Sequence, residues 1–350
     1  MATDSEWLRA RREGLTGSDA AAILDVSPYM TRWRVAAEKR GIQVEDPDEI
    51  ERRSVIRWGN VIEWPAIQEY ARVTGRGLAG AIDAWRPLVP GADLELLSHG
   101  EGEPRIFATS LERPWMRCTP DFLIPCWSPL PGAIDQVERD GAGLGELKTC
   151  HARQAHRWAD GPPLHVRAQA QWNMATLGLS WAAVPVLIGG HRWLEPLEWL
   201  AREYGMEALL AALDGHPLWE EVELRWYDEP AHPRFQAHLI AEADRFRERY
   251  IIGDAMPPFE TIEDARAVAK VYPRDNGRQE LLPAALADVD REREEALAAI
   301  AAAEKRLAVA EGRIVEAIGE SRGGVIDGTA VRYWLKTRKS GGRILRREKV

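Results

Sequence analysis

Three residues, Asp121, Glu146 and Lys148, have the types and the spacing that the hydrolysis of a phosphate ester needs. Glu146 and Lys148 lie two apart in GLGELKTC, a stretch typical of a half-buried strand, in which alternate side chains share a face. Asp121 lies in a second strand-like stretch, RCTPDFLI, and joins them if the strands pair. Two converging carboxylates repel each other unless a cation lies between them. Oxygen ligands favour Mg²⁺, for which Mn²⁺ is a substitute.

Each residue then has a separate task in a metal-dependent hydrolysis. The Leu147 carbonyl is expected as a further metal ligand beside the two carboxylates. A metal ion held there polarises the scissile phosphate and lowers the pKa of a bound water. Lys148 orients that water or stabilises the developing negative charge. From neighbouring helices, Glu63 could hold a second metal or its water shell, and Gln169 could bond the phosphate or the nucleophile.

The elements that must position these residues indicate an α/β or α+β domain with a mixed sheet. A helix is expected to begin near Ser18, with Ser18 or Asp19 as its N-cap. Pro and Gly turn signals between 125 and 143 indicate an inserted hairpin or loop. Further expected elements are a helix over 60–74, a helix over 163–178 that ends at Gly178, and a strand over 181–190.

The chain changes character after about residue 255, which predicts a domain over 1–255, a linker over 256–283 and a separate region over 284–350. A long helix is expected over 284–319. Its apolar residues recur in sevenfold steps that Arg293 interrupts: Leu286, Ile300, Leu307 and Ile314. This helix either forms a two-helix contact or lies on the first domain. The basic residues that follow are either a phosphate contact or a solvated terminus.

Composition excludes some classes of protein. The chain has 350 residues and a net charge of −9, which argues against a passive nucleic-acid coat but not against an enzyme that acts on DNA. It has no apolar run of the length that a transmembrane helix needs, and we expect no association with a membrane. Three scattered cysteines favour a reducing compartment, so we expect the cytoplasm, that of a host cell if the protein is phage-encoded.

The set Asp121, Glu146-x-Lys148 resembles the core of PD-(D/E)xK nucleases, which have a restriction-endonuclease-like fold. The surrounding blocks resemble the YqaJ-like viral recombinases, the family that includes phage lambda exonuclease. These blocks appear in the family's order over residues 7–190 and include Gly17 to Leu24, Trp58-Gly59-x-x-x-Glu63, Thr119-Pro120-Asp121, Glu146-Leu147-Lys148-Thr149 and Gln169-x-Gln171. The long helix resembles a C-terminal extension of longer members.

The resemblance implies a nuclease that degrades one strand of linear duplex DNA, usually 5′ to 3′, for recombination with a single-strand-annealing partner. It implies a ring-shaped, trimeric oligomer. By position, Asp121 and Glu146 would be the metal ligands, Lys148 the catalytic lysine, and Glu63 an assisting residue. The residues that fall where the family binds the terminal 5′-phosphate or the scissile region are Arg11, Ser18, Thr119, Gln169 and Gln171. Ile56 falls near an apolar wedge that splits the end base pair.

The chain departs from the family pattern in three places. A long insertion separates Asp121 from Glu146, and His165-Val166 stands where an aromatic residue usually precedes the glutamine pair. Pro65 lies two residues after Glu63 and is expected only in the first turn of a helix, which would place Glu63 near a helix start.

Two other functions fit the same residues. One is an endonuclease with the same core that needs no DNA end. The other is a non-catalytic DNA-binding accessory protein in which the long helix and basic tail matter most. The presence of Asp121, Glu146 and Lys148 together favours a catalytic function over binding alone.

Overall fold

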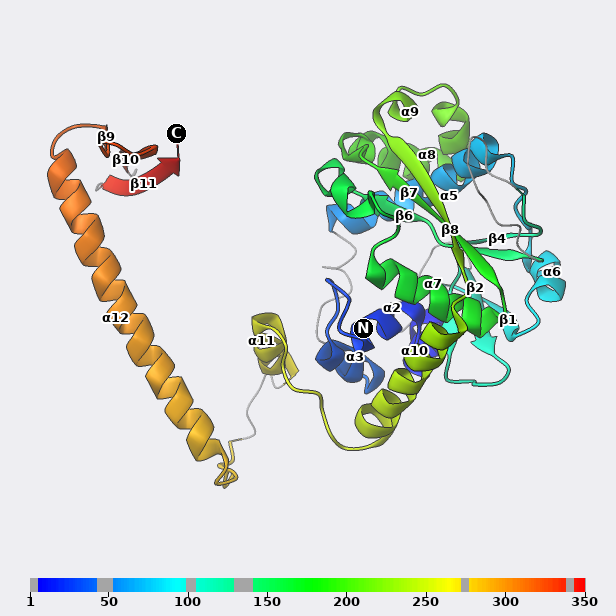
Figure 1. Ribbon diagram of the computed structural model, residues 1–350, viewed down its shortest axis with the longest axis horizontal. Helices are drawn as coiled ribbons and strands as arrows, with labels where there is room; N and C mark the ends of the chain where they lie inside the picture. The colour runs from blue at the N-terminus through cyan, green and yellow to red at the C-terminus, as the bar shows by residue number, and fades with distance from the viewer. Residues whose placement is uncertain are drawn as a thin grey trace. The chain divides into compact units, whose positions relative to one another are not determined.

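The computed structural model describes residues 6–42, 53–98, 105–128, 141–271, 277–337 and 343–349. The chain divides into two compact units, Met1–Arg274 and Asp275–Val350 (Figure 1). Each unit is described by itself below. In the described residues no helix has both the length and the apolar character needed to span a membrane.

The central sheet of the first unit is mixed and has five strands: β4 (Phe122–Ile124), β5 (Gly143–Gly145), β6 (Lys148–Cys150), β7 (Trp181–Ile188) and β8 (Glu223–Pro230). Strand β7 is buried at every residue and lies at the centre. It pairs with β5 and β6 in parallel and with β8 in antiparallel, and β4 pairs with β5 in antiparallel. This is the mixed sheet that the sequence predicts.

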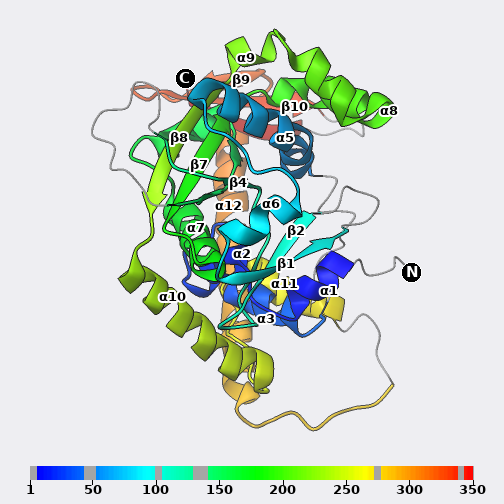
Figure 2. The same ribbon diagram turned by 90° about the vertical axis from the view of Figure 1, so that its right-hand side faces the viewer.

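Helices cover both faces of this sheet (Figures 1 and 2). Helix α7 (Leu164–Leu177) packs on one face, where Ala170 and Met174 join Val184 and Val186 of β7 in one core cluster. Helices α5 (Ser54–Thr74) and α8 (Leu194–Leu213) pack on the other face, against residues such as Leu187. The fold is therefore three layers, helix–sheet–helix, and the predicted α/β class with flanking helices is confirmed.

Much of the rest of the first unit surrounds the α7 face, whereas Leu218 packs in the cluster on the α5 and α8 face. A second sheet, in the order β1-β2-β3, contains β1 (Ala92–Leu97), β2 (Arg105–Ser110) and β3 (Arg117–Cys118). The short or peripheral helices are α1 (Glu6–Arg12), α2 (Gly17–Ile23), α3 (Arg32–Lys39), α6 (Ile82–Trp85), α9 (Leu218–Glu221), α10 (Pro233–Phe246) and α11 (Ile262–Val271). Helices α2 and α10 both contact α7, and with Trp172 they form a separate core cluster.

Several sequence expectations are confirmed and two are corrected. Helix α7 ends at Gly178, whose positive φ of 74° makes it the expected left-handed C-cap. Pro65, however, lies in the interior of the 21-residue helix α5, so Glu63 is not near a helix start. The N-cap of α2 is Thr16, two residues before Ser18. The predicted insertion over 125–143 falls largely on 129–140, outside the described residues.

The expected linker over 256–283 is corrected in its first part. It contains helix α11, whose Ala267 packs against Trp33 and Ala37 of α3. The buried Asp264 carboxylate accepts hydrogen bonds from Thr31 Oγ1 at 2.9 Å and Arg34 Nε at 3.1 Å. These contacts attach α11 to the first unit, which therefore extends past residue 255.

The second unit contains the expected long helix and a sheet that the sequence analysis missed. Helix α12 runs over Leu286–Ile318, and no residue in it is buried. After it come β9 (Gly323–Val325), β10 (Val331–Thr337) and β11 (Arg343–Lys349), which form an antiparallel sheet in the order β9-β10-β11 (Figure 1). The described residues of the expected basic tail therefore lie in a sheet.

Candidate active site

The site is built around a break in the strand that precedes β7. Strands β5 and β6 pair with β7 in the same register, since Leu144 lies opposite Ala182 and Lys148 opposite Val186. Glu146 and Leu147 lie between the two segments, and the Glu146 amide still donates to Ala183 O at 3.0 Å. Glu146 and Lys148 therefore keep the alternation of one strand, as the sequence predicts.

The Glu146 carboxylate is buried and is bound by three side chains. Its Oε1 accepts hydrogen bonds from Lys148 Nζ at 2.6 Å and from Gln169 Nε2 at 2.5 Å. Its Oε2 accepts one from Asn173 Nδ2 at 2.9 Å. Gln169 and Asn173 lie one turn apart on α7, so this helix fixes the carboxylate in place.

Lys148 lies between Glu146 and α7. Its Nζ also donates to Gln169 Oε1 at 3.1 Å, so the predicted lysine, glutamate and glutamine form one connected group. Burial lowers the pKa of Lys148, but Glu146, Asp121 and Glu63 outweigh burial and raise it overall. Lys148 is thus a protonated ammonium, suited to hold a water or a negative charge rather than to accept a proton.

Asp121 comes to the same group from the turn before β4. Its Oδ2 accepts a hydrogen bond from the Leu147 backbone amide at 2.8 Å. Burial raises the pKa of Asp121 well above its usual value, and the neighbouring Glu146 and Glu63 raise it further, while Lys148 and Arg105 oppose them. Asp121, Glu146 and Glu63 therefore lie close enough for their negative charges to repel one another.

Glu63 reaches this group from α5 and has a cationic partner that the sequence analysis missed. Arg105 of β2 lies 3.2 Å from its carboxylate. Burial raises the pKa of Glu63, against the effect of Arg105, and Glu146 raises it further. Arg105 and Asn173 both lie far along the chain from the residues they bind, and no spacing in the sequence points to either.

The chemistry of these donors fits a divalent cation. Three carboxylates share the site with two basic side chains, and burial leaves Asp121 and Glu63 with raised pKa values. A cation bound between Asp121 and Glu146 would relieve this excess of negative charge. Among the described residues, no three Asp, Glu, His or Cys side chains form a complete metal cluster. Backbone oxygen, substrate or water would therefore complete the ligand set.

Arg11 and Ser18 lie together beside the same part of α7. Arg11 Nη2 donates to Ser18 Oγ at 3.3 Å, and Ser18 Oγ lies 3.1 Å from Thr16 Oγ1. The adjacent Gly17 packs so closely on α7 that a Cβ there would lie 2.5 Å from Asn173 Oδ1. The structure therefore places the predicted arginine–hydroxyl pair next to the helix that holds Glu146.

Asp19 fixes this segment, a role that the sequence analysis did not assign. It is fully buried, and its Oδ2 accepts from the Thr16 amide at 2.8 Å and lies 2.7 Å from Lys39 Nζ. Burial raises the pKa of Asp19, but Lys39 and Arg11 outweigh burial and lower it overall. Because the Asp19 carboxylate accepts the hydrogen bond that caps α2, the Ser18 hydroxyl can accept one from Arg11.

The other predicted site residues are less central. Gln171 is buried, and its amide bonds Pro230 O at 2.7 Å and the His232 amide at 2.9 Å. These contacts join α7 to the end of β8, and the expected role of Gln171 in phosphate binding stays a prediction. Thr119 is half-buried between β3 and β4, and Ile56 is exposed in the first turn of α5.

The residue that departs from the family pattern, His165, lies in the first turn of α7. Its ring contacts Tyr29 edge-on at 5.7 Å between ring centroids. Burial lowers the pKa of His165, and nearby Lys148 and Arg157 lower it further. The imidazole of His165 is therefore neutral at physiological pH.

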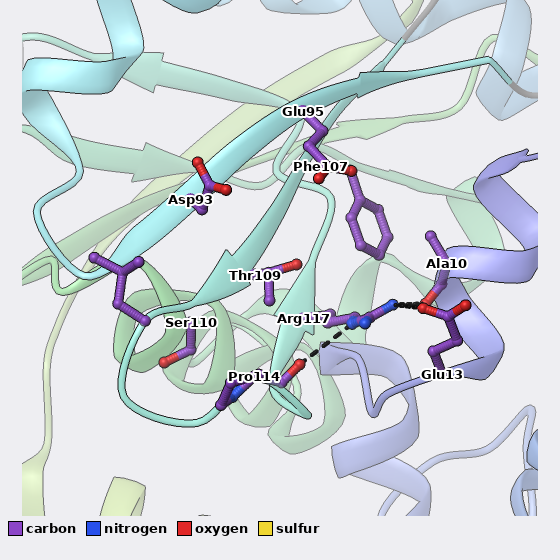
Figure 3. A pocket seen from close by; sticks show the side chains of 10 residues that line it. Ala10, Glu13, Asp93, Glu95, Phe107, Thr109, Ser110, Pro114 and Arg117 are labelled. Carbon is purple, nitrogen blue, oxygen red and sulfur yellow. Dashed lines mark hydrogen bonds and ion pairs between the residues drawn. The ribbon is translucent and has the colours of Figure 1, made fainter.

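A hollow of about 370 Å³ lies elsewhere on the first unit, beside β1 and β2 (Figure 3). Arg117 lines it and is already bound to Glu13 and to the carbonyls of Ala10 and Pro114. Asp93 and Glu95 add negative charge to its wall. It shares no residue with the carboxylate–lysine group and its acidic lining does not suit a nucleic acid, so it is not the site.

The fold and site define an α/β protein whose central sheet carries a buried carboxylate–lysine group. The chain belongs to the family of the YqaJ-like viral recombinase domain, whose profile matches residues 6–180. No curated protein of similar sequence was found.

Two solved structures of one protein are similar to this chain. The crystal structure of an alkaline exonuclease, LHK-Exo, from Laribacter hongkongensis is 16% identical, with a TM-score of 0.39. The alignment covers 77% of this chain and 94% of that one. Its complex with dAMP is 15% identical, with a TM-score of 0.38 and the same coverage.

Proposed function

We propose that this protein is a Mg²⁺-dependent exodeoxyribonuclease that degrades one strand of linear duplex DNA from its end, for recombination by single-strand annealing. The observation that carries the proposal is the group formed by Asp121, Glu146, Lys148 and Gln169, which lies within the part of the chain that matches the family. We propose the 5′ to 3′ polarity, the annealing partner and a trimeric ring on the resemblance to the family alone.

The residues of the site have distinct tasks in this reaction. Asp121, Glu146 and the Leu147 carbonyl would hold the metal ion, which when bound polarises the scissile phosphate and lowers the pKa of a water. The Lys148 ammonium orients that water and stabilises the negative charge that develops. Gln169 fixes Lys148 and Glu146 relative to each other. Glu63, paired with Arg105, adds negative charge on the α5 side.

The Arg11–Ser18 pair is our candidate site for the terminal 5′-phosphate. A guanidinium and a hydroxyl suit a phosphate, because charge-assisted hydrogen bonds to an anion are strong. Thr16 Oγ1 lies within hydrogen-bond distance of Ser18 and enlarges this polar group. An end-dependent enzyme needs such an anchor near its metal site, and an enzyme that cuts within a duplex does not.

A comparison of two substrates tests the proposal. Purified protein with Mg²⁺ is given a 5′-phosphorylated linear duplex and a covalently closed circle, with EDTA and Lys148→Ala as controls. We expect degradation of the linear duplex alone, abolished by EDTA and by the substitution. Cleavage of the circle would replace the exonuclease with an endonuclease. DNA binding without metal-dependent cleavage of either substrate would leave a binding protein.

The anchor is tested separately with the substrate's end. Removal of the 5′-phosphate from the linear duplex, or Arg11→Ala on the phosphorylated duplex, is expected to slow degradation about tenfold or more, because one charged contact is lost in each case. The two changes together should be no worse than either alone. Additive losses would show that Arg11 acts elsewhere.

A further inference from the structure

The charge of this protein is divided unevenly along the chain. Residues 321–350 contain nine Lys and Arg against two acids, in a chain whose net charge is −9. Part of this charge lies on the β9-β10-β11 sheet of the second unit. An acidic protein that concentrates cations on one small sheet has a surface suited to a polyanion.

The register of the sheet gathers cations around one exposed indole. In an antiparallel pair, residues directly opposite each other lie on the same face. Trp334 of β10 lies opposite Arg346 of β11, and Arg332 and Lys336 are two residues away on the same strand. The residues of this surface, which we call the Trp334 face, are Gly323, Val325, Arg332, Trp334, Lys336, Ile344, Arg346 and Glu348.

The Trp334 face is open. Trp334 is 41% exposed, and Arg332, Lys336 and Arg346 are exposed as well. On its other side Trp334 lies opposite Gly323, which has no side chain to cover the indole. A Cβ at that glycine would lie 2.3 Å from Tyr333 O, so the close approach of β9 to β10 requires glycine. The absence of a side chain there leaves the indole uncovered.

The opposite face of the same sheet is the one that packs. Leu335 is only 7% exposed, and its neighbours on that face, Tyr333 and Leu345, are half-buried. Gly324 lies on this face too, and a Cβ there would be 3.9 Å from Ile318 at the end of α12. Hydrophobic packing of the sheet therefore explains Leu335 but does not explain an indole on the outer side.

We propose that the Trp334 face binds single-stranded DNA, with an unpaired base stacked on the indole and the adjacent phosphates bound by Arg332, Lys336 and Arg346. Aromatic side chains among cations on a sheet are a known means of binding single strands. A duplex is a poorer ligand for stacking because its bases already stack on each other. Glu348, opposite Arg332, is the one acid on this face.

This surface extends the proposed function, because an exonuclease that removes one strand leaves the other strand unpaired. The preference for DNA over RNA rests on the proposed exonuclease function. The stacking of a base on Trp334 is argued from the β9-β10-β11 sheet alone. Binding is measured in EDTA on the full-length chain carrying Lys148→Ala, so a failure of the nuclease proposal does not affect the result.

The test is fluorescence anisotropy with labelled oligo-dT of about 16 nucleotides, a length within the range of known single-strand sites. Trp334→Ala is expected to weaken binding about tenfold, within the ~1–3 kcal/mol that one stacked base contributes. Trp334→Phe should retain most of the affinity. Trp199→Ala is the matched control, since Trp199 of α8 is 51% exposed and should not matter.

A second variant keeps the indole and removes charge. Arg332→Ala with Arg346→Ala should reduce the slope of log affinity against log salt by about 1.4, or ~0.7 for each phosphate contact to a single strand. Arg202→Ala, an exposed arginine of α8, should leave the slope unchanged. This pair keeps the proposal testable if Trp334→Ala does not fold.

Three results would overturn the proposal. The first is unchanged oligo-dT affinity for Trp334→Ala and an unchanged salt slope for the double arginine variant. The second is an equal loss of affinity for a blunt duplex, which would indicate a charged surface without stacking. The third is equal binding of oligo-rU, which would remove the preference for DNA.

Discussion

The Lys148 ammonium lies 2.6 Å from the Glu146 carboxylate across a break in the strand between β5 and β6. The break places Leu147 between them, with its amide on Asp121 at 2.8 Å. Residues 146–148 thus bring a carboxylate, an ammonium and a second carboxylate to one point. Because the Glu146 amide donates to β7, the Leu147 amide faces the other edge of the strand and meets Asp121 there.

Lys148→Ala is expected to reduce Mg²⁺-dependent degradation of linear duplex by about 10²–10³-fold, because it removes a cation aimed at the developing charge. DNA binding should be retained within a few-fold. Steady-state cleavage and anisotropy in EDTA measure the two effects. Arg72→Ala, an exposed arginine of α5 paired with Glu69, is the control and should change neither. Retention of cleavage by Lys148→Ala would remove the lysine from the mechanism.

Asp121→Asn is expected to stabilise the metal-free protein at neutral pH. Burial and the nearby Glu146 raise the pKa of Asp121 in the folded state, so its ionisation favours the unfolded state. The contribution of Asp121 to the stability of the wild type is fully present below the unfolded-state pKa of about 3.9 and is lost as the pH rises through the folded-state pKa. The advantage of Asp121→Asn should therefore be absent near pH ~4 and grow with pH.

Urea unfolding in EDTA at several pH values measures this advantage as the difference in the free energy of unfolding between the two proteins. Asp214→Asn is the control, because Asp214 is exposed. Added Mg²⁺ should stabilise the wild type and not Asp121→Asn. An advantage that falls as the pH rises would show that a cationic neighbour, rather than burial, governs Asp121.

The sequence predicted a mixed sheet with strands over 117–124, 144–150 and 181–190, and the group Asp121, Glu146, Lys148 and Gln169, because order and strand spacing are local features. It did not predict β8. It did not predict Asn173 or Arg105, since a contact between distant segments leaves no periodic signal. The sheet formed by β10 and β11 left a signal of another kind. Val331, Tyr333, Trp334 and Ile344 are of the β-branched and aromatic types that strands favour, but the cations around them were interpreted as a tail.

Pro65 shows how packing overrides a local rule. A proline inside a helix costs about 3 kcal/mol, which led to the expectation of a helix start at Glu63. In the structure Val61, Ile62 and Ala66 around it are buried in the core beneath the sheet. At about 1.5–3 kcal/mol for each large apolar side chain, this burial outweighs the cost of the proline.

Asn173→Ala is expected to raise the Mg²⁺ concentration needed for half-maximal cleavage about tenfold, because the Glu146 Oε2 loses its buried donor. Asn173→Asp should raise it further, since a second negative charge would face Glu146. Titration of Mg²⁺ in the cleavage assay measures both. Thr176→Val is the control: Thr176 lies on the same helix, its hydroxyl donates to Trp172 O, and the substitution should leave the Mg²⁺ requirement unchanged. Equal requirements for Asn173→Ala and the wild type would mean that Gln169 and Lys148 alone position Glu146.

Gly17→Ala tests how closely α2 must pack on α7, and Gly59→Ala in α5 is its matched control. A Cβ at Gly17 would lie 2.5 Å from Asn173 Oδ1 and 3.1 Å from the Gln169 carbonyl, and the backbone of α7 cannot yield cheaply. Gly17→Ala should therefore destabilise the protein by about 1–3 kcal/mol. At Gly59 the nearest atom, Thr149 Oγ1, is 3.9 Å away, so Gly59→Ala should stabilise helix α5 by about 0.5–1 kcal/mol.

Urea unfolding of the two variants in EDTA gives both free energies without the contribution of metal binding. Because Gly17 lies against the two α7 residues that hold Glu146, Gly17→Ala should also raise the Mg²⁺ requirement. Asn173→Ala removes the side chain that a Cβ at residue 17 would strike, so it should recover part of the stability lost in Gly17→Ala. If Gly17→Ala were as stable as the wild type, α2 would not pack as closely on α7 as the Gly17–Asn173 contact requires, and the place of Ser18 beside the site would fail with it.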